Sequence, residues 1–338
     1  MRTRPPAQPG DREPGTGDRG WTRREIAVLG AGALLSTRLA RAGSGPLVRP
    51  GRVGLAELAT PPPGARLDRA AARAALERAL VAATGEPTAG KAVAALFSPS
   101  DTVGIKLNCL AASLSPRIEL VEALVALLRE RGVPPERIVV FERSARELQR
   151  ARYPIRRDGD DYRCFGVDGD WDAEPSTSGA IGSCFARLVS TTCTALVGFG
   201  VVKDHDLAGI SASLKNWYGV IHNPNKYHDN HCDPYVADVA RHRFVRDKLR
   251  LTVVDGVTGQ YHGGPAWRPD AAWPLGLVIA STDQVAVDAW AWRLIDGERV
   301  KHGLPKVADA GRPPRFIATA AGYGLGVGDP GAVREVRG

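Results

Sequence analysis

The sequence predicts an α/β fold with a mainly parallel sheet and helices on both faces. From residue 69 onward, short runs rich in β-branched residues alternate with longer stretches whose apolar residues recur at helical spacing. The chain has 338 residues, of which 43% are hydrophobic and 24% charged, as in a globular protein with a sizeable core. Strands that alternate with helices are joined by right-handed crossovers, which make the sheet parallel and cover both of its faces.

Each element is predicted from its own residues. The first helix is expected at 69–83, an Ala-rich segment with Leu76 and Leu80 on one side. Apolar runs bounded by turn residues predict strands at 103–107, 137–141, 195–202, 249–254 and 275–280. Helical spacing predicts further helices at 117–131, 211–220, 235–244, 283–294 and 315–322.

Two segments interrupt this alternation. Residues 43–68 contain Pro46, Pro50 and three consecutive prolines at 61–63, which predict a Pro-rich extended linker. Around residues 150–190 the chain becomes rich in charge, and we expect an insertion or a lid there. No internal repeat indicates a solenoid or a propeller. We therefore expect a single α/β domain over residues 69–338, built as one lobe or two.

Residues 1–42 have the segment order of an export signal. The pair Arg23-Arg24 precedes a modestly hydrophobic run at 26–35, and Ala40-Arg41-Ala42 forms a small-x-small cleavage site. The paired arginines resemble a twin-arginine signal. We expect export across the cytoplasmic membrane, to the periplasm or beyond, with the twin-arginine export machinery as a partner. The alternative is an amphipathic N-terminal helix of the domain. The apolar run is too short for a permanent transmembrane helix.

Charge and cysteine content argue against several classes of protein. The formal net charge is +8, and half of it lies in residues 1–42. The remaining charge is too small and too dispersed to indicate nucleic-acid binding. The five cysteines form no C-x-x-C pair, so we expect neither an iron–sulfur cluster nor a zinc ribbon.

Ionisable residues follow two of the predicted strands. Lys203-Asp204-His205-Asp206 comes directly after the run at 195–202, and Lys106 and Asn108 lie at the end of the run at 103–107. In open α/β sheets, ligands bind beyond the carboxyl ends of the strands. We expect Lys106, Lys203 and His205 to form a catalytic site there for a small anionic ligand that Asn108 contacts. The alternative is that each lysine only solvates the end of its strand.

Small residues precede the predicted helix at 211–220. Free backbone N–H groups at the start of a helix can bind an anion, so Ser211 and Ser213 are predicted to bind substrate. Lys215 would supply a positive charge, and Asn216 would orient the substrate. The segment is not a P-loop, because the glycine spacing and the Lys-Ser/Thr ending of that motif are missing.

Four of the seven histidines lie between residues 205 and 231. Two of them, His228 and His231, have Cys232 and Asp233 beside them. Imidazole, thiolate and carboxylate together are typical ligands of a divalent transition metal such as Zn, Fe, Ni or Cu. We therefore treat these four residues as candidate metal ligands. The alternative is a polar loop whose side chains cap turns and the helix that begins near Asp233-Pro234.

Three aspartates after residue 250 are predicted to have mainly structural roles. Asp255 follows the strand at 249–254 in a turn signal, although a carboxylate at a strand end can also contact a substrate, and we keep it as a substrate-binding candidate. Asp283 is predicted to cap the next helix, and Asp288 follows it. Glycines at 322–328 are spaced nearly as in a dinucleotide loop, but no strand leads into them.

Several blocks of the chain together resemble one family. The first blocks are residues 103–108, 203–205 and 215–219. His228 and residues 232–234 follow, and the last blocks are residues 254–255, 263–265 and 283–288. They are similar to the domain of unknown function 362 family over roughly residues 90–335, and Lys215-Asn216-Trp217-Tyr218-Gly219 is the most specific block. Exported members with a twin-arginine signal are the most similar subgroup. Some relatives carry a ferredoxin-like domain with cysteine clusters, which this chain lacks. The resemblance implies no particular reaction.

Two functions fit these residues. The first is an enzyme for a small anionic substrate, with or without a metal. In it Lys106, Lys203 and Lys215 bind charge, His205 is the general acid or base, and Asn216 orients the substrate. The second is a non-catalytic protein that holds a metal or an anion for another component. A redox protein with an organic cofactor is a third option. The sequence leaves the substrate and the cofactor open.

Overall fold

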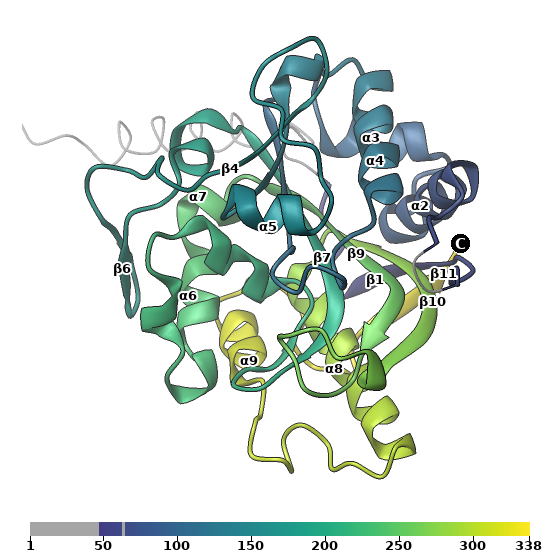
Figure 1. The fold of residues 1–338 in the computed structure, drawn as a ribbon, viewed down its shortest axis with the longest axis vertical. Coiled ribbons are helices and arrows are strands. Elements are labelled where there is room, and N and C mark those ends of the chain that lie inside the picture. Colours follow the sequence, from purple (N-terminus) through teal and green to yellow (C-terminus); the bar gives the residue numbers. More distant parts are fainter. Residues whose placement is uncertain (1–46, 63–64) are drawn as a thin grey trace, which may run out of the picture. The chain divides into compact units, whose positions relative to one another are not determined.

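The computed structural model describes residues 47–62 and 65–338, and most of the strands in this part of the chain join one nine-stranded sheet (Figure 1). Every strand on its main path runs parallel to the others except β10, which is antiparallel to both of its neighbours. The sheet is therefore mainly parallel, as predicted. Its order is β11 (Arg334–Arg337), β1 (Arg52–Glu57), β10 (Ala272–Ser281), β9 (Leu249–Gln260), β7 (Ala195–His205), β2 (Val103–Leu107), β3 (Ile138–Glu142) and β4 (Arg163–Gly166).

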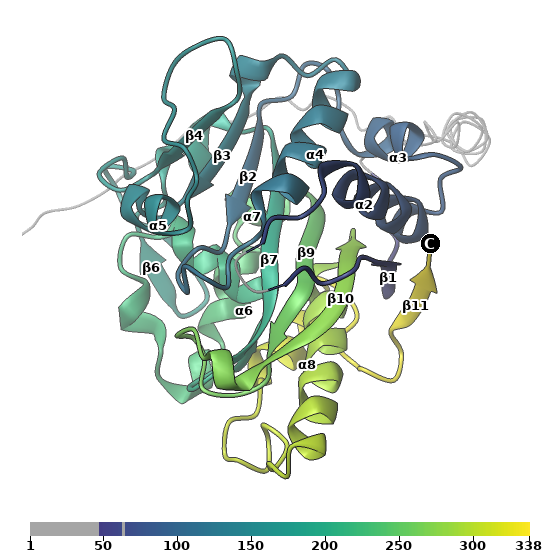
Figure 2. The same ribbon diagram turned by 45° about the vertical axis from the view of Figure 1, so that its right-hand side comes forward.

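Helices cover both faces of the sheet, which confirms the predicted fold class (Figure 2). Alternate residues of each strand enter different cores, because successive side chains of a strand point to opposite faces. Ile105 and Val140 pack in one core, and Phe141 and Val254 pack in the other. The first core contains α2 (Arg69–Thr84), α3 (Ala89–Leu96), α4 (Ile118–Glu130) and α5 (Ala145–Arg150). The second contains α6 (Tyr235–Arg241), α7 (Arg243–Arg246), α8 (Gln284–Lys301) and α9 (Arg315–Gly322).

Two segments that we expected to lie outside the sheet contribute strands to it. β1 lies within the predicted linker at 43–68, and it pairs with β10 and β11. β4 lies within the predicted insertion at 150–190, and it pairs with β3 at the other edge. Both strands are short and lie beside turn-rich or charged chain, so their apolar pattern is weak. The rest of the insertion includes a hairpin of β5 (Ser176–Ser178) and β6 (Ile181–Ser183).

Strand β7 is longer than predicted. It continues through Lys203, Asp204 and His205, because β8 (Gly209–Ser211) folds back and pairs with these three residues. Gly209 has φ +82°, a conformation that glycine adopts without steric cost. Of the four polar residues that we placed after the strand, the first three are its last residues, and these three are buried.

The predicted helix at 211–220 is instead a short 3₁₀ helix, η3, at Leu214–Val220. Ser211 belongs to β8, and Ser213 precedes the helix. The predicted helix at 235–244 is divided into α6 and α7 at His242, whose backbone leaves the helical region (φ −58°, ψ 138°). Among the helices of residues 47–62 and 65–338, none combines the length and apolar character needed to cross a membrane. The predicted export signal lies outside the described residues.

Candidate functional site

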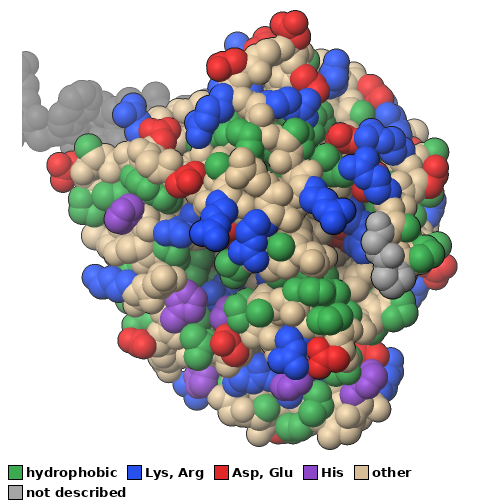
Figure 3. All heavy atoms as spheres, in the orientation of Figure 1, with side chains coloured by type: hydrophobic (Ala, Val, Ile, Leu, Met, Phe, Trp, Pro, Cys, Tyr) green, Lys and Arg blue, Asp and Glu red, His purple; other side chains and the backbone are tan. Residues whose placement is uncertain are grey.

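A cavity of about 350 Å³ lies beyond the carboxyl ends of β2, β3 and β7. We call it the site cavity. Parallel neighbours end at the same edge of a sheet, so residues distant in sequence meet there. Figure 3 shows Lys and Arg side chains across the middle of one face of the molecule, with His side chains below them. Of the predicted site residues, those that line the cavity are Lys106, Asn108, Lys203, His205, Ser211, Lys215, Asn216 and His228.

Each N–H donor of the Lys106 ammonium group has a partner within the protein. Its Nζ forms a buried ion pair with Glu142 and donates to Asn216 Oδ1 at 3.1 Å and to the carbonyl oxygen of Leu107 at 2.5 Å. The Asn216 amide donates in return to the Lys106 carbonyl oxygen at 2.9 Å. An ammonium has three hydrogens, and three partners use them all. Lys106 therefore joins β2, β3 and η3, and its charge is balanced within the chain.

Lys203 has a different environment. Its side chain is buried, and its Nζ has one hydrogen-bond partner among the described residues, the Asn108 Oδ1 at 2.9 Å. Burial lowers the pKa of Lys203 to about 8, with the positive charge of Lys215 as a smaller cause in the same direction. A substantial fraction of this amine is therefore neutral near physiological pH.

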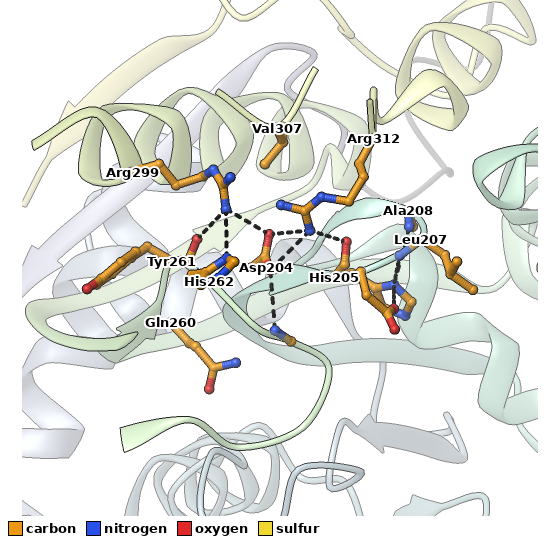
Figure 4. A network of polar contacts seen from close by, with 12 residues as sticks. Asp204, His205, Leu207, Ala208, Gln260, Tyr261, His262, Arg299, Val307 and Arg312 are labelled. Carbon is orange, nitrogen blue, oxygen red and sulfur yellow. Dashed lines mark hydrogen bonds and ion pairs between the residues drawn. The ribbon is translucent and has the colours of Figure 1, made fainter. Parts of the chain in front are cut away.

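His205 is oriented through its Nδ1 atom. That nitrogen accepts hydrogen bonds from the backbone N–H groups of Leu207 at 3.2 Å and Ala208 at 3.3 Å (Figure 4). An Asp206 carboxylate oxygen also lies 3.1 Å from Nδ1. Burial, followed by the charges of Lys215 and Lys203, lowers the pKa of His205 to about 2. The ring is then neutral, and because Nδ1 is an acceptor, the proton is assigned to Nε2.

Lys215 and His228 form a second oriented pair. His228 Nδ1 lies 3.0 Å from the Pro224 carbonyl oxygen, which can only accept, so Nδ1 carries the proton. Its Nε2 then accepts from the Lys215 Nζ at 3.1 Å. Burial lowers the pKa of Lys215, and burial together with Lys215 lowers that of His228. The Lys215 Nζ also lies 4.3 Å from the ring centroid of Tyr218, a cation–π contact.

The predicted anion site at the start of the 211–220 segment already holds a carboxylate. Asp288 of α8 accepts hydrogen bonds from the backbone N–H groups of Ala212 at 3.2 Å, Ser213 at 2.8 Å and Leu214 at 2.8 Å. Burial raises the pKa of Asp288 to about 7, although these three bonds act to lower it. Ser213 is not among the residues that line the site cavity, so our substrate-binding assignment for it is corrected.

Asp255 is also a structural residue. Its carboxylate accepts from the Arg117 backbone N–H and from the Arg117 Nη1, both at 2.7 Å, and it is fully buried. It thus fixes the start of α4 against β9. Because Asp255 is not among the residues that line the site cavity, the substrate-binding prediction for it is corrected.

The four predicted metal ligands do not come together. His228 faces the site cavity, whereas the His231 Nδ1 lies 3.2 Å from the Leu207 carbonyl oxygen, and Cys232 is buried. Positive φ angles at Asn230, His231 and Cys232 turn the chain between these side chains. Over residues 47–62 and 65–338, no group of three or more His, Cys, Asp or Glu side chains is arranged to hold a metal ion. We therefore withdraw the ligand set His228, His231, Cys232 and Asp233.

Four charged residues that line the site cavity were not among the predicted site residues: Glu142, Arg143, Glu147 and Asp206. Glu142 ends β3 and accepts from the Cys109 backbone N–H at 2.7 Å in addition to pairing with Lys106. Arg143 and Glu147 follow it, and both line the cavity. Burial, with Glu142 as the next cause, raises the pKa of Glu147. The signal that could have found Glu142 is its position at the end of a third apolar run, as for Lys106 in β2.

Asp204 points away from the residues beside it in β7. Its carboxylate binds Arg312 Nη1 at 2.9 Å and lies 3.7 Å from Arg299 Nη1, and Arg312 also donates to the His205 carbonyl oxygen at 3.0 Å (Figure 4). Alternation along a strand explains why Lys203 and His205 line the site cavity while Asp204 between them does not. This ion cluster fixes the backbone that carries both cavity residues.

The comparisons with known proteins concern the same region of the chain. A family model described as domain of unknown function (DUF362) matches residues 103–293. The chain belongs to this family. The DUF362 match contains every residue that lines the site cavity, whereas Arg299 and Arg312 lie beyond it. The match confirms the family to which the sequence is similar, and the description of the family states no reaction.

Comparison with curated proteins finds no match. Among solved structures, the DUF362 chain is similar to a crystal structure of a protein from Thermotoga maritima, with 11% sequence identity and a TM-score of 0.39. The similarity covers 71% of this chain and 60% of the Thermotoga chain.

Proposed function

We propose that this protein is an enzyme that acts on a small anionic molecule bound in the site cavity. The observation that carries the proposal is the bonding of Lys203 and Lys215, two buried amines whose Nζ atoms each have one hydrogen-bond partner in the described part of the chain. An ammonium has three donors, so each retains two. Buried charges are costly unless they are paired, and a bound anion would pair them.

The neighbouring side chains support a division of roles. Lys215, oriented by His228, would bind the anionic group of the substrate. The neutral His205 would donate a hydrogen bond from Nε2 to a substrate oxygen, a narrower role than the general acid or base expected from the sequence. Lys106 and Asn216 would hold η3 and the end of β2 in position without binding substrate. Asn108 would orient Lys203.

Anion binding can be tested with Lys215→Met. Isothermal calorimetry with glycolate, phosphate and small dicarboxylates would identify the anion that binds most tightly. We expect the variant to bind this anion at least about tenfold more weakly, because one charge-assisted hydrogen bond is lost. Lys226→Met, at an exposed lysine of the 3₁₀ helix Pro224–Tyr227 that does not line the cavity, is the matched control and should bind normally. If both variants bind like the unmodified protein, the site cavity is not the anion site.

Catalysis must be separated from simple binding, because a protein that stores an anion would show the same calorimetry. His205→Asn retains an acceptor for the Leu207 and Ala208 N–H groups but has no Nε2–H. We expect it to bind the anion within about threefold of the unmodified protein, a small free-energy change. Turnover of the anion, followed by mass spectrometry of the products, should fall at least about tenfold. Binding without turnover in the unmodified protein would instead favour the non-catalytic alternative.

We also propose that the chain is an exported member of its family that uses the twin-arginine route. The support is the sequence of residues 23–42, with Arg23-Arg24, the hydrophobic run and Ala40-Arg41-Ala42. In a bacterial host with a functional twin-arginine translocase, we expect a processed chain beginning at Gly43 outside the cytoplasm. Arg23→Lys with Arg24→Lys should retain the full-length chain inside. Equal export in a host that lacks the translocase would contradict this route.

A further inference from the structure

The lysines of the site cavity are not chemically equivalent. Lys106 has three partners, one of them the carboxylate of Glu142, and Lys215 has an imidazole partner and an aromatic face. Lys203 has the amide oxygen of Asn108, a neutral acceptor. Its Nζ therefore has the environment least able to stabilise a proton, although it lies in the same cavity as the other two.

The charged and titratable groups around Lys203 act in both directions. Lys215 and Lys106 disfavour its protonated form, whereas Glu142 and Cys109 favour it, and burial outweighs all four. Glu142 is already paired with Lys106, and burial raises the pKa of the Cys109 thiol, which is therefore neutral. Lysines that are desolvated beside another cation are the ones that act as nucleophiles toward carbonyl groups.

We propose that Lys203 forms an imine with the carbonyl carbon of a substrate that also carries a carboxylate, as in 2-oxo acids. This inference rests on the proposed function, and it names the substrate class of that site. Lys215 would bind the carboxylate, and His205 would donate to the carbonyl oxygen. The three side chains come from β7 and η3 and line one cavity, as such a substrate requires.

The step needs no other reactant. The lone pair of the neutral Nζ attacks the carbonyl carbon, and the electrons of the C=O π bond move to oxygen, which gains a proton to give a carbinolamine. The nitrogen lone pair then forms the C=N bond as the C–O bond breaks. The two amine hydrogens leave with the carbonyl oxygen as one molecule of water, so no oxidation or reduction occurs.

The test uses glyoxylate, which has an aldehyde and a carboxylate, with the full chain and sodium cyanoborohydride. The reductant converts an imine into a stable carboxymethyl amine, and peptide mass spectrometry locates it. At pH 7.5 we expect Lys203 to be modified at least about tenfold faster than the exposed Lys301, because part of the Lys203 amine is neutral at this pH and Lys203 lies in the cavity that binds the carboxylate. Lys203→Arg should remove this adduct, and Lys301→Arg should not.

The outcomes separate this inference from the proposed function. Adducts spread over exposed lysines, or formed first on Lys215, would overturn the assignment of Lys203. Glycolate, which has a hydroxyl group in place of the aldehyde of glyoxylate, tests the anion site alone by calorimetry. If glycolate binds and Lys203 forms no adduct, the imine is wrong and the anion site stands. If neither binding nor an adduct is found, both fail. Because the adduct is mapped on the unmodified protein, the result does not depend on the folding of Lys203→Arg.

Discussion

The carboxylate of Asp288 accepts a hydrogen bond of 2.8 Å from the backbone N–H of Leu214, 74 positions earlier in the chain. Two further N–H groups, of Ala212 and Ser213, share the same carboxylate. Helix α8 thereby determines where η3 begins, and η3 carries Lys215 and Asn216 into the site cavity. Asp288, which does not line the site cavity, thus positions two side chains that do.

Removal of this carboxylate should be costly. We expect Asp288→Ala to lower the free energy of unfolding by at least about 3 kcal/mol at pH 8, since several charge-assisted hydrogen bonds are lost and buried N–H groups remain unpaired. Asp288→Asn should have an intermediate effect, because its amide oxygen still accepts. Urea unfolding measures both. Asp309→Ala, at an exposed turn, is the control, and an equal loss in that variant would contradict the argument.

The buried pair of Lys106 and Glu142 predicts strong coupling. Lys106→Met leaves a buried carboxylate without its cation and should cost about 3–5 kcal/mol in urea unfolding. Lys106→Met with Glu142→Gln should be more stable than the sum of the two single effects predicts. Arg73→Met, in a more exposed pair with Glu130, should change stability by less than about 1 kcal/mol. Additive single effects would show that the pair is not coupled.

His205 predicts a specific dependence of stability on pH. Its pKa is about 2 in the folded chain and about 6.5 in the unfolded chain, so below pH 6.5 the unfolded state binds the additional proton. The stabilisation is therefore complete above pH 6.5 and is lost progressively as the pH falls toward 2. At pH 5.5 the loss should be about 1.4 kcal/mol relative to pH 7.5.

The variant His205→Asn should lack this component. Denaturant unfolding of both proteins between pH 5 and 8 gives the difference, in which the titrating groups that do not interact with His205 cancel. If the two proteins lose stability in parallel as the pH falls, His205 is not held neutral by the fold.

The contact between His228 and Lys215 predicts that two substitutions of His228 differ in their effect on anion affinity. In His228→Gln, the amide oxygen can replace Nε2 as the acceptor for Lys215, so anion affinity should stay within about threefold. In His228→Leu the acceptor is lost, and affinity should fall by about tenfold as Lys215 loses its orientation. Calorimetry with the anion identified for the site makes the comparison. Equal affinities in the two variants would mean that His228 does not position Lys215.

Much of the fold was predictable because it depends on local patterns. The strand at 103–107 was predicted at its observed bounds, since β-branched and apolar residues are continuous there. β1 was missed because prolines surround its six residues, and no local pattern reports that a strand will find partners near the opposite end of the chain. The end of β7 was missed because Lys203 to His205 are polar, and their burial depends on β8 and on distant arginines.

The site was predictable where it depends on strand ends and not where it depends on tertiary partners. Lys106, Asn108, Lys203 and His205 come directly from strands that meet at one edge of the sheet. The role of Asp288 required knowledge of a contact 74 positions away. The metal prediction failed for a related reason, since closeness in sequence at residues 228–233 does not bring side chains together when the backbone turns between them.

The place of β1 between β10 and β11 affects how the chain can be made. A ribosome synthesises β1 early, and both strands that flank it emerge late. During most of translation, the edges of β1 have no partner, and the sheet can close only after the distal segments have left the exit tunnel. Any premature stop that removes β10 would therefore leave the earliest strand unpaired, a state prone to capture by chaperones or to aggregation.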